Sequence, residues 1–271
     1  MHTVTVGRPA HRYSTVRAAR KVNGMLKFAG ESAKIRHLRL LGYRHIYSFS
    51  LPSGWTCPYA LDCLSKAVVV NGKAHIQDGK STLFRCFEAT DEARYSTVRA
   101  AREENFTTLR ALKTTDAMAT SLLEALPTKA DVVRIHIGGD FYNEAYFKAW
   151  VQVALARPRV HFYAYTKSIA YWLNSRDSIP DNLVLQASLG GSQDTIALMN
   201  RLKTARVVYH PNEADRLGIE IDHDESHAVK GSASFALLIH GTQPKGSNAS
   251  RAIKRLKREQ VSFSYTGRLV T

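Results

Sequence analysis

The sequence predicts an α/β fold: a partial or distorted (β/α) barrel with an N-terminal helical extension. Beyond residue 106, short apolar runs of strand length alternate with longer segments of helical period. Right-handed crossovers would wind about six such units into an open or closed barrel. A doubly wound sheet is the alternative, but the chain lacks the Gly-x-Gly-x-x-Gly motif and the complete P-loop that are typical of it.

The expected strands are short and rich in β-branched and aromatic residues. The first, residues 46–51, precedes a loop that holds two cysteines. Later strands are expected at residues 132–139, 160–166, 183–188, 206–210 and 235–241. Because their apolar residues run almost without interruption, both faces of the sheet should be covered.

Helices are expected between these strands, where apolar side chains recur every three or four residues. Residues 106–126 should form one such helix, with leucines spaced for a single buried side. Further helices are expected at residues 144–156, 168–174, 192–203 and 247–259. We expect Ser192 to be the N-cap of the helix at 192–203, and Asp224 or Ser226 to be another N-cap.

The segment Arg-Tyr-Ser-Thr-Val-Arg-Ala-Ala-Arg occurs twice, at residues 12–20 and 94–102. Nine identical residues indicate a copied segment or one constraint that acts twice, and two copies are too few for a solenoid. In the second copy, Tyr95, Val98 and Ala101 are spaced for one face of a helix.

The net charge of +15 on this chain of 271 residues is concentrated at its two ends. Residues 1–61 hold ten Lys and Arg residues against one acid, and residues 245–271 hold seven against one. We therefore expect a basic helical extension, residues 1–45, and a barrel-like domain, residues 46–271. The basic ends could bind nucleic acid if they meet in space, or could simply be solvated helix faces.

No apolar run is long enough to cross a membrane, and no signal peptide is evident. We therefore expect a cytoplasmic protein with no membrane partner.

Polar side chains follow the expected parallel strands at their carboxyl ends, where sites form in α/β folds. They are His136, Asp140, Tyr165, Lys167, Ser168, Gln186, Ser188, His210 and His240. Lys167 is the candidate for stabilising an anion or transferring a proton, and Asp140 and His136 could pair as acid and base. The other six are candidates for binding a ligand, although each alone would more often be a loop or capping residue.

The chain has three cysteines, Cys57, Cys63 and Cys86. An odd number in an intracellular protein argues against disulfides and leaves a metal site, a reactive thiol or unrelated buried cysteines. Zinc would need a fourth ligand, for which His75 is the candidate. A [4Fe-4S] cluster ordinarily takes four thiolates, so three would leave one iron open to a substrate or solvent. The spacing of the cysteines alone does not decide among a zinc site, an iron–sulfur cluster, a reactive thiol and unrelated buried cysteines.

Five segments in order resemble a family of phage-encoded proteins, the gene-product-88 family, common in mycobacteriophages. They are FSLPSGWTCPYALDCLSKA, RCFEATDEARYSTVRAAREEN, RIHIGGDF, FYAYTKS and HGTQPKGS, and the likeness runs from about residue 46 to the C-terminus. It implies a three-cysteine iron–sulfur site at Cys57, Cys63 and Cys86 on a partial (β/α) barrel, in the cytoplasm of an infected bacterium.

The chain is also distantly similar to radical S-adenosylmethionine enzymes. Those enzymes place their cysteines as Cys-x3-Cys-x2-Cys within one loop, whereas 22 residues separate Cys63 from Cys86 here. We therefore do not predict use of S-adenosylmethionine.

Two functions follow from these observations. The first is a [4Fe-4S] enzyme whose open iron binds a small molecule, for sulfur or sulfide chemistry or another Lewis-acid or redox reaction. The alternative is a phage nucleic-acid-binding protein with a structural cluster or zinc ion. Its phosphate contacts would come from the last expected helix, through Arg251, Lys254, Arg255, Lys257 and Arg258. The chain shows no base-reading motif to support that alternative.

Overall fold

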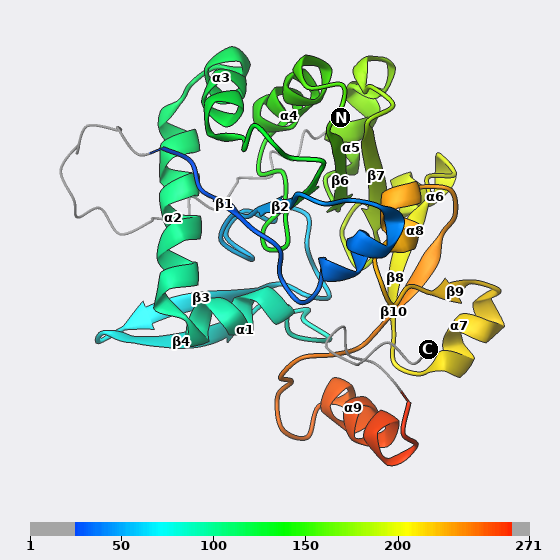
Figure 1. Cartoon of the computed structure of the whole chain (residues 1–271). Coiled ribbons are helices and arrows are strands. Elements are labelled where there is room, and N and C mark those ends of the chain that lie inside the picture. The colour runs from blue at the N-terminus through cyan, green and yellow to red at the C-terminus, as the bar shows by residue number, and fades with distance from the viewer. Residues whose placement is uncertain (1–24, 262–271) are drawn as a thin grey trace, which may run out of the picture.

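The computed structural model describes residues 25–261, and its centre is an eight-stranded sheet (Figure 1). In sheet order the strands are β1 (Phe28–Ala29), β2 (Ile46–Phe49), β5 (Val132–Ile135), β6 (His161–Thr166), β7 (Leu183–Ser188), β8 (Thr204–Val208), β10 (Phe235–Leu238) and β9 (Glu220–Ile221). All neighbouring strands are parallel except β1 and β2. From β2 to β8 the sheet follows chain order, as in a (β/α) barrel, but the described strands do not close into one. The predicted partial barrel is confirmed.

The other elements surround this sheet. They are the hairpin strands β3 (Ser65–Val70) and β4 (Lys73–Asp78), the helices α1 (Phe87–Arg94), α2 (Ser96–Ala111), α3 (Thr115–Ala125), α4 (Glu144–Ala156), α5 (Ile169–Asn174), α6 (Asp194–Met199), α7 (Pro211–Leu217), α8 (Ser226–Lys230) and α9 (Asn248–Arg258), and the 3-10 helices η1 (Arg36–Leu41) and η2 (Arg176–Ser178). The hairpin is separate from the main sheet.

The two faces of the sheet are covered by different elements. Helices α2, α3 and α4 cover one face, where Trp150 of α4 contacts the rings of Phe49 and Phe162. On the opposite face, Leu38 of η1 and Val229 of α8 are buried in a second core cluster. Because successive residues of a strand point to opposite faces, covering both faces explains why these strands are apolar throughout.

Two predicted elements form with the predicted bounds, α4 and β7. Strand β5 ends earlier than expected, at Ile135, because His136 has a φ of 67° and turns the chain out of the sheet.

The single helix predicted at residues 106–126 is wrong, because two helices form there. Helix α2 ends at Ala111, and α3 begins after Thr114, whose hydroxyl accepts a hydrogen bond from the N–H of Ala117 (3.2 Å). The N-cap at Thr114 starts a new helix in the middle of a continuous apolar pattern.

Three further details differ from the predictions. Ser192 is not an N-cap, since α6 starts at Asp194, after Gln193. The N-cap of α8 is Glu225, although the Asp224 carboxylate does accept a hydrogen bond from the N–H that begins this helix (3.0 Å). The second copy of the repeated segment spans the break between α1 and α2, so Tyr95 is exposed rather than on a helix face. The first copy lies outside the described residues.

The part of the predicted extension that the structure describes, residues 25–45, contains β1 and η1. Both pack on the sheet, so the boundary at residue 46 stays a prediction. Within residues 25–261, no helix combines the length and the hydropathy needed to span a membrane.

Candidate functional site

The loop after β2 carries Cys57 and Cys63 across the carboxyl edge of the sheet. Near its start, Gly54 has a φ of 70°, and a Cβ there would lie 2.3 Å from a backbone oxygen of β3. Only glycine fits this close approach. Further along, Ala60 forms an isolated bridge with Gly191, after β7. The loop is therefore fixed both behind β2 and behind β7.

The hairpin β3–β4 returns the chain to this loop and brings Cys86 beside it. The N–H groups of Leu83 and Phe84, which follow the hairpin, donate to the carbonyl of Asp62 (2.8 and 3.0 Å) next to Cys63. Cys86 then precedes the first residue of α1. The 22 residues between Cys63 and Cys86 are thus mainly one hairpin and its return.

The three thiols are free. Desolvation raises the pKa of Cys57 well above its ordinary value, and the charges of Asp140, Cys86 and Cys63 add to this effect. Desolvation also raises the pKa of Cys86 to about 12, with the charge of Cys63 adding to it. Backbone donors oppose this. The N–H of Gly54 lies 3.3 Å from Cys57 Sγ, and two N–H groups in the first turn of α1 lower the pKa of Cys86.

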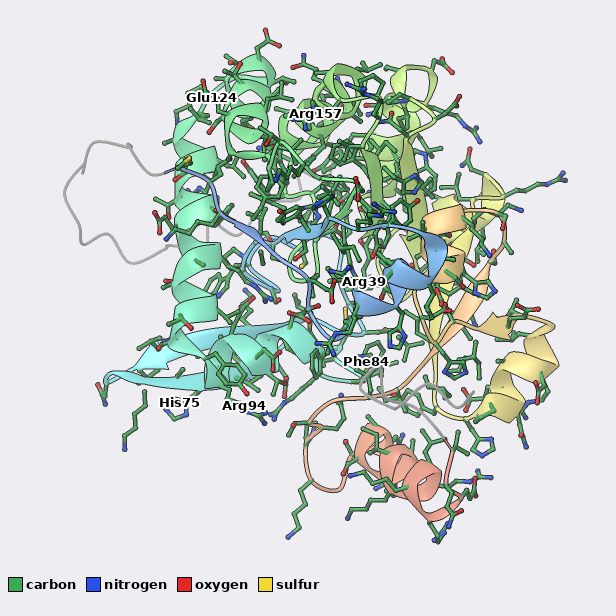
Figure 2. All side chains as sticks on the ribbon, viewed as in Figure 1. Arg39, His75, Phe84, Arg94, Glu124 and Arg157 are labelled. Carbon is green, nitrogen blue, oxygen red and sulfur yellow. The ribbon has the colours of Figure 1, made fainter. Side chains whose placement is uncertain are left out.

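The geometry of the cysteines bears differently on the two metals considered. Within residues 25–261, no group of three or more His, Cys, Asp or Glu side chains is placed to hold one metal ion. His75, the candidate fourth zinc ligand, is exposed on β4. Figure 2 shows it on the side of the hairpin turned away from the main sheet. As described, the arrangement gives zinc no fourth ligand from His75.

A buried ion-pair network lies behind the cysteine loop and was not predicted from the sequence. Arg102 of α2 pairs with Glu88 and with Glu92 of α1, its Nη1 2.6 Å from Glu92 Oε1. The same Glu92 oxygen accepts hydrogen bonds from the N–H and the hydroxyl of Ser53 (2.9 and 3.0 Å). Burial raises the pKa of Glu88, but the charge and hydrogen bond of Arg102 together with the charges of Lys34 and Arg134 outweigh this effect, and the pKa is lowered. Arg102 ends the second copy of the repeat, which was the one available signal.

The predicted site residues Asp140, Lys167 and Ser188 do meet at the carboxyl ends of β5, β6 and β7. The Asp140 carboxylate accepts hydrogen bonds from the Thr166 hydroxyl (2.7 Å) and the Lys167 N–H (2.8 Å). The Lys167 ammonium donates to the hydroxyl (3.0 Å) and carbonyl (2.9 Å) of Ser188 and to the Leu189 carbonyl (2.6 Å). Burial raises the pKa of Asp140 to about 6. These contacts tie the three strand ends together.

His136 does not form the predicted pair with Asp140. Its Nε2 lies 2.9 Å from the Tyr146 hydroxyl, and its ring packs edge-on against Phe141. Burial, followed by the charge of Arg134, lowers the pKa of His136 to about 3, so the imidazole is neutral at pH 7.

The remaining predicted ligand-binding residues lie in separate places. The Ser168 hydroxyl donates to the Phe141 carbonyl (2.8 Å). The guanidinium carbon of Arg134 lies 4.8 Å from the centre of the Tyr165 ring. Gln186 is fully buried and faces α8. His210 begins α7 and lies 2.7 Å from Glu259.

A cavity of about 890 Å³ adjoins the cysteine site. Its walls are residues 27–34, β2, the first turns of α1, the middle of α2 and the end of β10. Phe87 and Glu88 in its wall directly follow Cys86 in the chain, and none of the three cysteines lines the cavity itself. Of the predicted strand-end residues, His240 lines it, and burial lowers the pKa of this histidine to about 4.

The basic residues of α9 form an exposed face at some distance from the cavity. Ile253 and Leu256 of α9 pack on Ile239, so the opposite side of the helix faces outward. All five of its Lys and Arg residues are exposed: Arg251, Lys254, Arg255, Lys257 and Arg258. Figure 1 shows α9 at the lower edge of the molecule, below β10.

Comparison with known proteins gave one match. The sequence model of the family described as Gene product 88 matches residues 17–258. The likeness therefore begins well before residue 46, where the motifs had placed its start. No curated protein and no solved structure matched the chain.

Proposed function

This chain belongs to the gene-product-88 family, and we propose that it is a [4Fe-4S] enzyme that acts on a small molecule in a phage-infected bacterium. Cys57, Cys63 and Cys86 would hold three irons, and the fourth iron would be open. The observation that carries the proposal is the meeting of all three cysteines at the carboxyl edge of the sheet, beside a cavity.

The donor set fits such a cluster. Desolvation keeps the thiols of Cys57 and Cys86 protonated in the absence of a cation, so a cationic iron centre would replace their protons. Backbone N–H groups aimed at these two sulfurs would stabilise them as thiolates, a common second layer of support at iron–sulfur sites.

When bound, an open-site cluster can supply Lewis-acid or redox chemistry, and sulfur or sulfide chemistry is the first class to test. The chain's own groups would bind and orient the substrate in the adjoining cavity. His240 would line it as a neutral hydrogen-bonding group, because its pKa is about 4. Lys167 and Asp140 would position the strand ends rather than touch the substrate, since their hydrogen bonds run to the protein.

The test is the metal content and the visible and electron paramagnetic resonance spectra of protein purified without oxygen. About four irons per chain are expected. The Cys86→Ala variant should lose the iron, while Ser81→Ala, an exposed control in the same segment, should keep it. One zinc per chain, or equal iron in Cys86→Ala and Ser81→Ala, would contradict the proposal.

The second candidate function is nucleic-acid binding, and the basic face of α9 favours it. Five exposed cations and no acid occupy the helix from Asn248 to Arg258. If these residues bind phosphates, reversing the charge of Lys254 and Lys257 should lower the affinity for DNA and flatten its dependence on salt. A matched reversal of Lys80, exposed on the hairpin, should change neither. Equal effects in the two variants would remove this candidate.

A further inference from the structure

The cavity beside Cys86 has the size of a small-molecule site and a mainly apolar wall. Its volume of about 890 Å³ is in the upper part of the range of about 300 to 1,000 Å³ that is usual for such sites. The apolar side chains in its wall are Phe28, Ala29, Ala33, Phe87, Val98, Ala101 and Ile137. Val98 and Ala101 belong to the second copy of the repeated segment, so that copy builds part of the wall.

The cations in the wall are matched by carboxylates of the protein. Lys27 pairs with Glu104 across the rim. Arg102 pairs with two carboxylates, those of Glu88 and Glu92. A charged ligand would therefore find no excess positive charge to compensate the loss of its hydration, which is costly for an ion in a buried place.

Lys34 and Asp91, the remaining charged residues of the wall, do not change this conclusion. Burial and the charge of Arg134 lower the pKa of Lys34, while the nearby carboxylates of Glu225 and Glu88 raise it, so this cation has protein charges of both signs around it. Burial and the charge of Glu88 raise the pKa of Asp91, which disfavours additional negative charge at that position.

One polar group of the wall does need a partner from outside the described protein. The Ser32 hydroxyl is buried and has no hydrogen-bond partner within residues 25–261. Leaving a buried hydroxyl unpaired costs free energy, and an oxygen acceptor on a ligand would remove that cost once the Ser32 side chain turns its oxygen, now inaccessible, toward the cavity.

We propose that this cavity binds an uncharged, mainly apolar molecule that carries a hydrogen-bond acceptor, such as a carbonyl oxygen, for Ser32. That this molecule is the substrate rests on the proposed function as a [4Fe-4S] enzyme. Its binding requires only the cavity and not the cluster.

The test is calorimetric titration of the full-length chain, with its metal, with three probes of equal carbon number: methyl octyl ketone, decanoate and decylamine. The neutral ketone should bind about tenfold or more tightly than either ion, because neither ion finds a compensating charge. Ketone binding no tighter than that of decanoate or decylamine, or no ketone binding at all, would overturn the proposal.

Two pairs of variants place the ketone in the cavity. Val98→Trp should weaken binding by occupying part of the space beside α2, whereas Leu155→Trp, at an exposed position on α4, should leave it unchanged. Ser32→Ala should weaken binding about fivefold through loss of one hydrogen bond, with Ser81→Ala as its control. Equal binding by Val98→Trp and Leu155→Trp would place the ketone elsewhere and overturn the proposal.

Iron content measured on the same preparations separates this proposal from the proposed function. Full iron without ketone binding would refute the ligand class and leave the cluster standing. Ketone binding to a chain without iron would refute the cluster and leave the cavity as a binding site.

Discussion

Two groups of polar side chains lie at the carboxyl edge of the same sheet, and they use their hydrogen bonds differently. Around Asp140 and Lys167, the hydrogen bonds described run to hydroxyl or backbone groups of the protein, although the charge of Asp140 also helps to raise the pKa of Cys57. Around Cys86, thiols are held close together, with a cavity on one side and the Arg102 ion pairs behind them. We call the first group, Asp140 and Lys167 with their hydrogen-bond partners, the brace, because its hydrogen bonds connect the ends of three strands. The second group contains free thiols that are available to a ligand.

This difference shows why residue type at a strand end is a weak guide to chemistry. Asp140 and Lys167 suggest catalysis in the sequence, and in the structure their side chains form hydrogen bonds to the protein, so their catalytic role stays a prediction. Desolvation raises the pKa values of Cys57 and Cys86, which disfavours their thiolate forms unless a cation lies beside them, and a metal partner at these thiols stays a proposal.

The largest effect expected is on the ion pairs behind the cysteines. Arg102→Met leaves Glu88 and Glu92 buried without their cation, and removing one partner of a buried pair costs about 3 to 5 kcal/mol. The free energy of unfolding in urea measures this loss. Arg99→Met is the control, since Arg99 belongs to the same repeated segment but donates only to a backbone carbonyl (2.6 Å). A loss no larger than in Arg99→Met would show that the network does not support the cysteine loop.

The parts of this molecule that could be predicted are those with a local signal. The helix Glu144–Ala156 was predicted to the residue because its apolar residues repeat and Asn143 caps it. The hairpin β3–β4 was missed although it has a local signal: β3 ends in three valines, and Asn71 and Gly72, both with a positive φ, form a turn that is typical of hairpins. The Arg102 network was missed because Glu88, Glu92 and Ser53 meet only after α1 and α2 fold back on each other, which no spacing records.

The next effect tests the brace through its pH dependence. The pKa of Asp140 is about 6 in the folded protein, against 3.8 when unperturbed. The contribution of its protonated form to stability is fully present below pH 3.8 and is lost as the pH rises through about 6, a change of about 3 kcal/mol. Asp140→Asn cannot ionise, so the stability of the wild type relative to this variant should fall between pH 4 and pH 7.

Urea unfolding of both proteins across this range measures the difference, and iron content should be the same in both. Parallel pH profiles would show that Asp140 does not carry a raised pKa. Loss of iron in Asp140→Asn would show that Asp140 supports the cysteine site rather than only the ends of the strands.

A smaller loss of stability is expected for a glycine of the cysteine loop. It distinguishes the strain of a positive φ from a steric contact with β3. Gly54 and Gly72 have similar φ values, 70° and 76°, but a Cβ would meet the backbone of β3 only at Gly54. Both alanine substitutions incur the strain of a positive φ, so Gly54→Ala should cost about 1 to 3 kcal/mol more than Gly72→Ala. Thermal or urea unfolding measures the difference, and only Gly54→Ala should also lower the iron content. Equal costs would mean that the loop can move away from β3, and the cysteine site would then be less rigid than described.

The smallest change in the free energy of unfolding is expected for two exposed lysines of α9, and the other variants can be compared with it. Lys254 and Lys257 are exposed on α9, so replacing both with alanine should change the free energy of unfolding by less than about 0.5 kcal/mol per residue and leave the iron content unchanged. The outward face of α9 carries charge without structural cost, whereas the same kind of charge on Arg102 is buried and paired. If the double alanine variant unfolded as readily as Arg102→Met, burial would not be the reason for the difference between the two regions. The basic face would then be part of the fold rather than a surface available to phosphates.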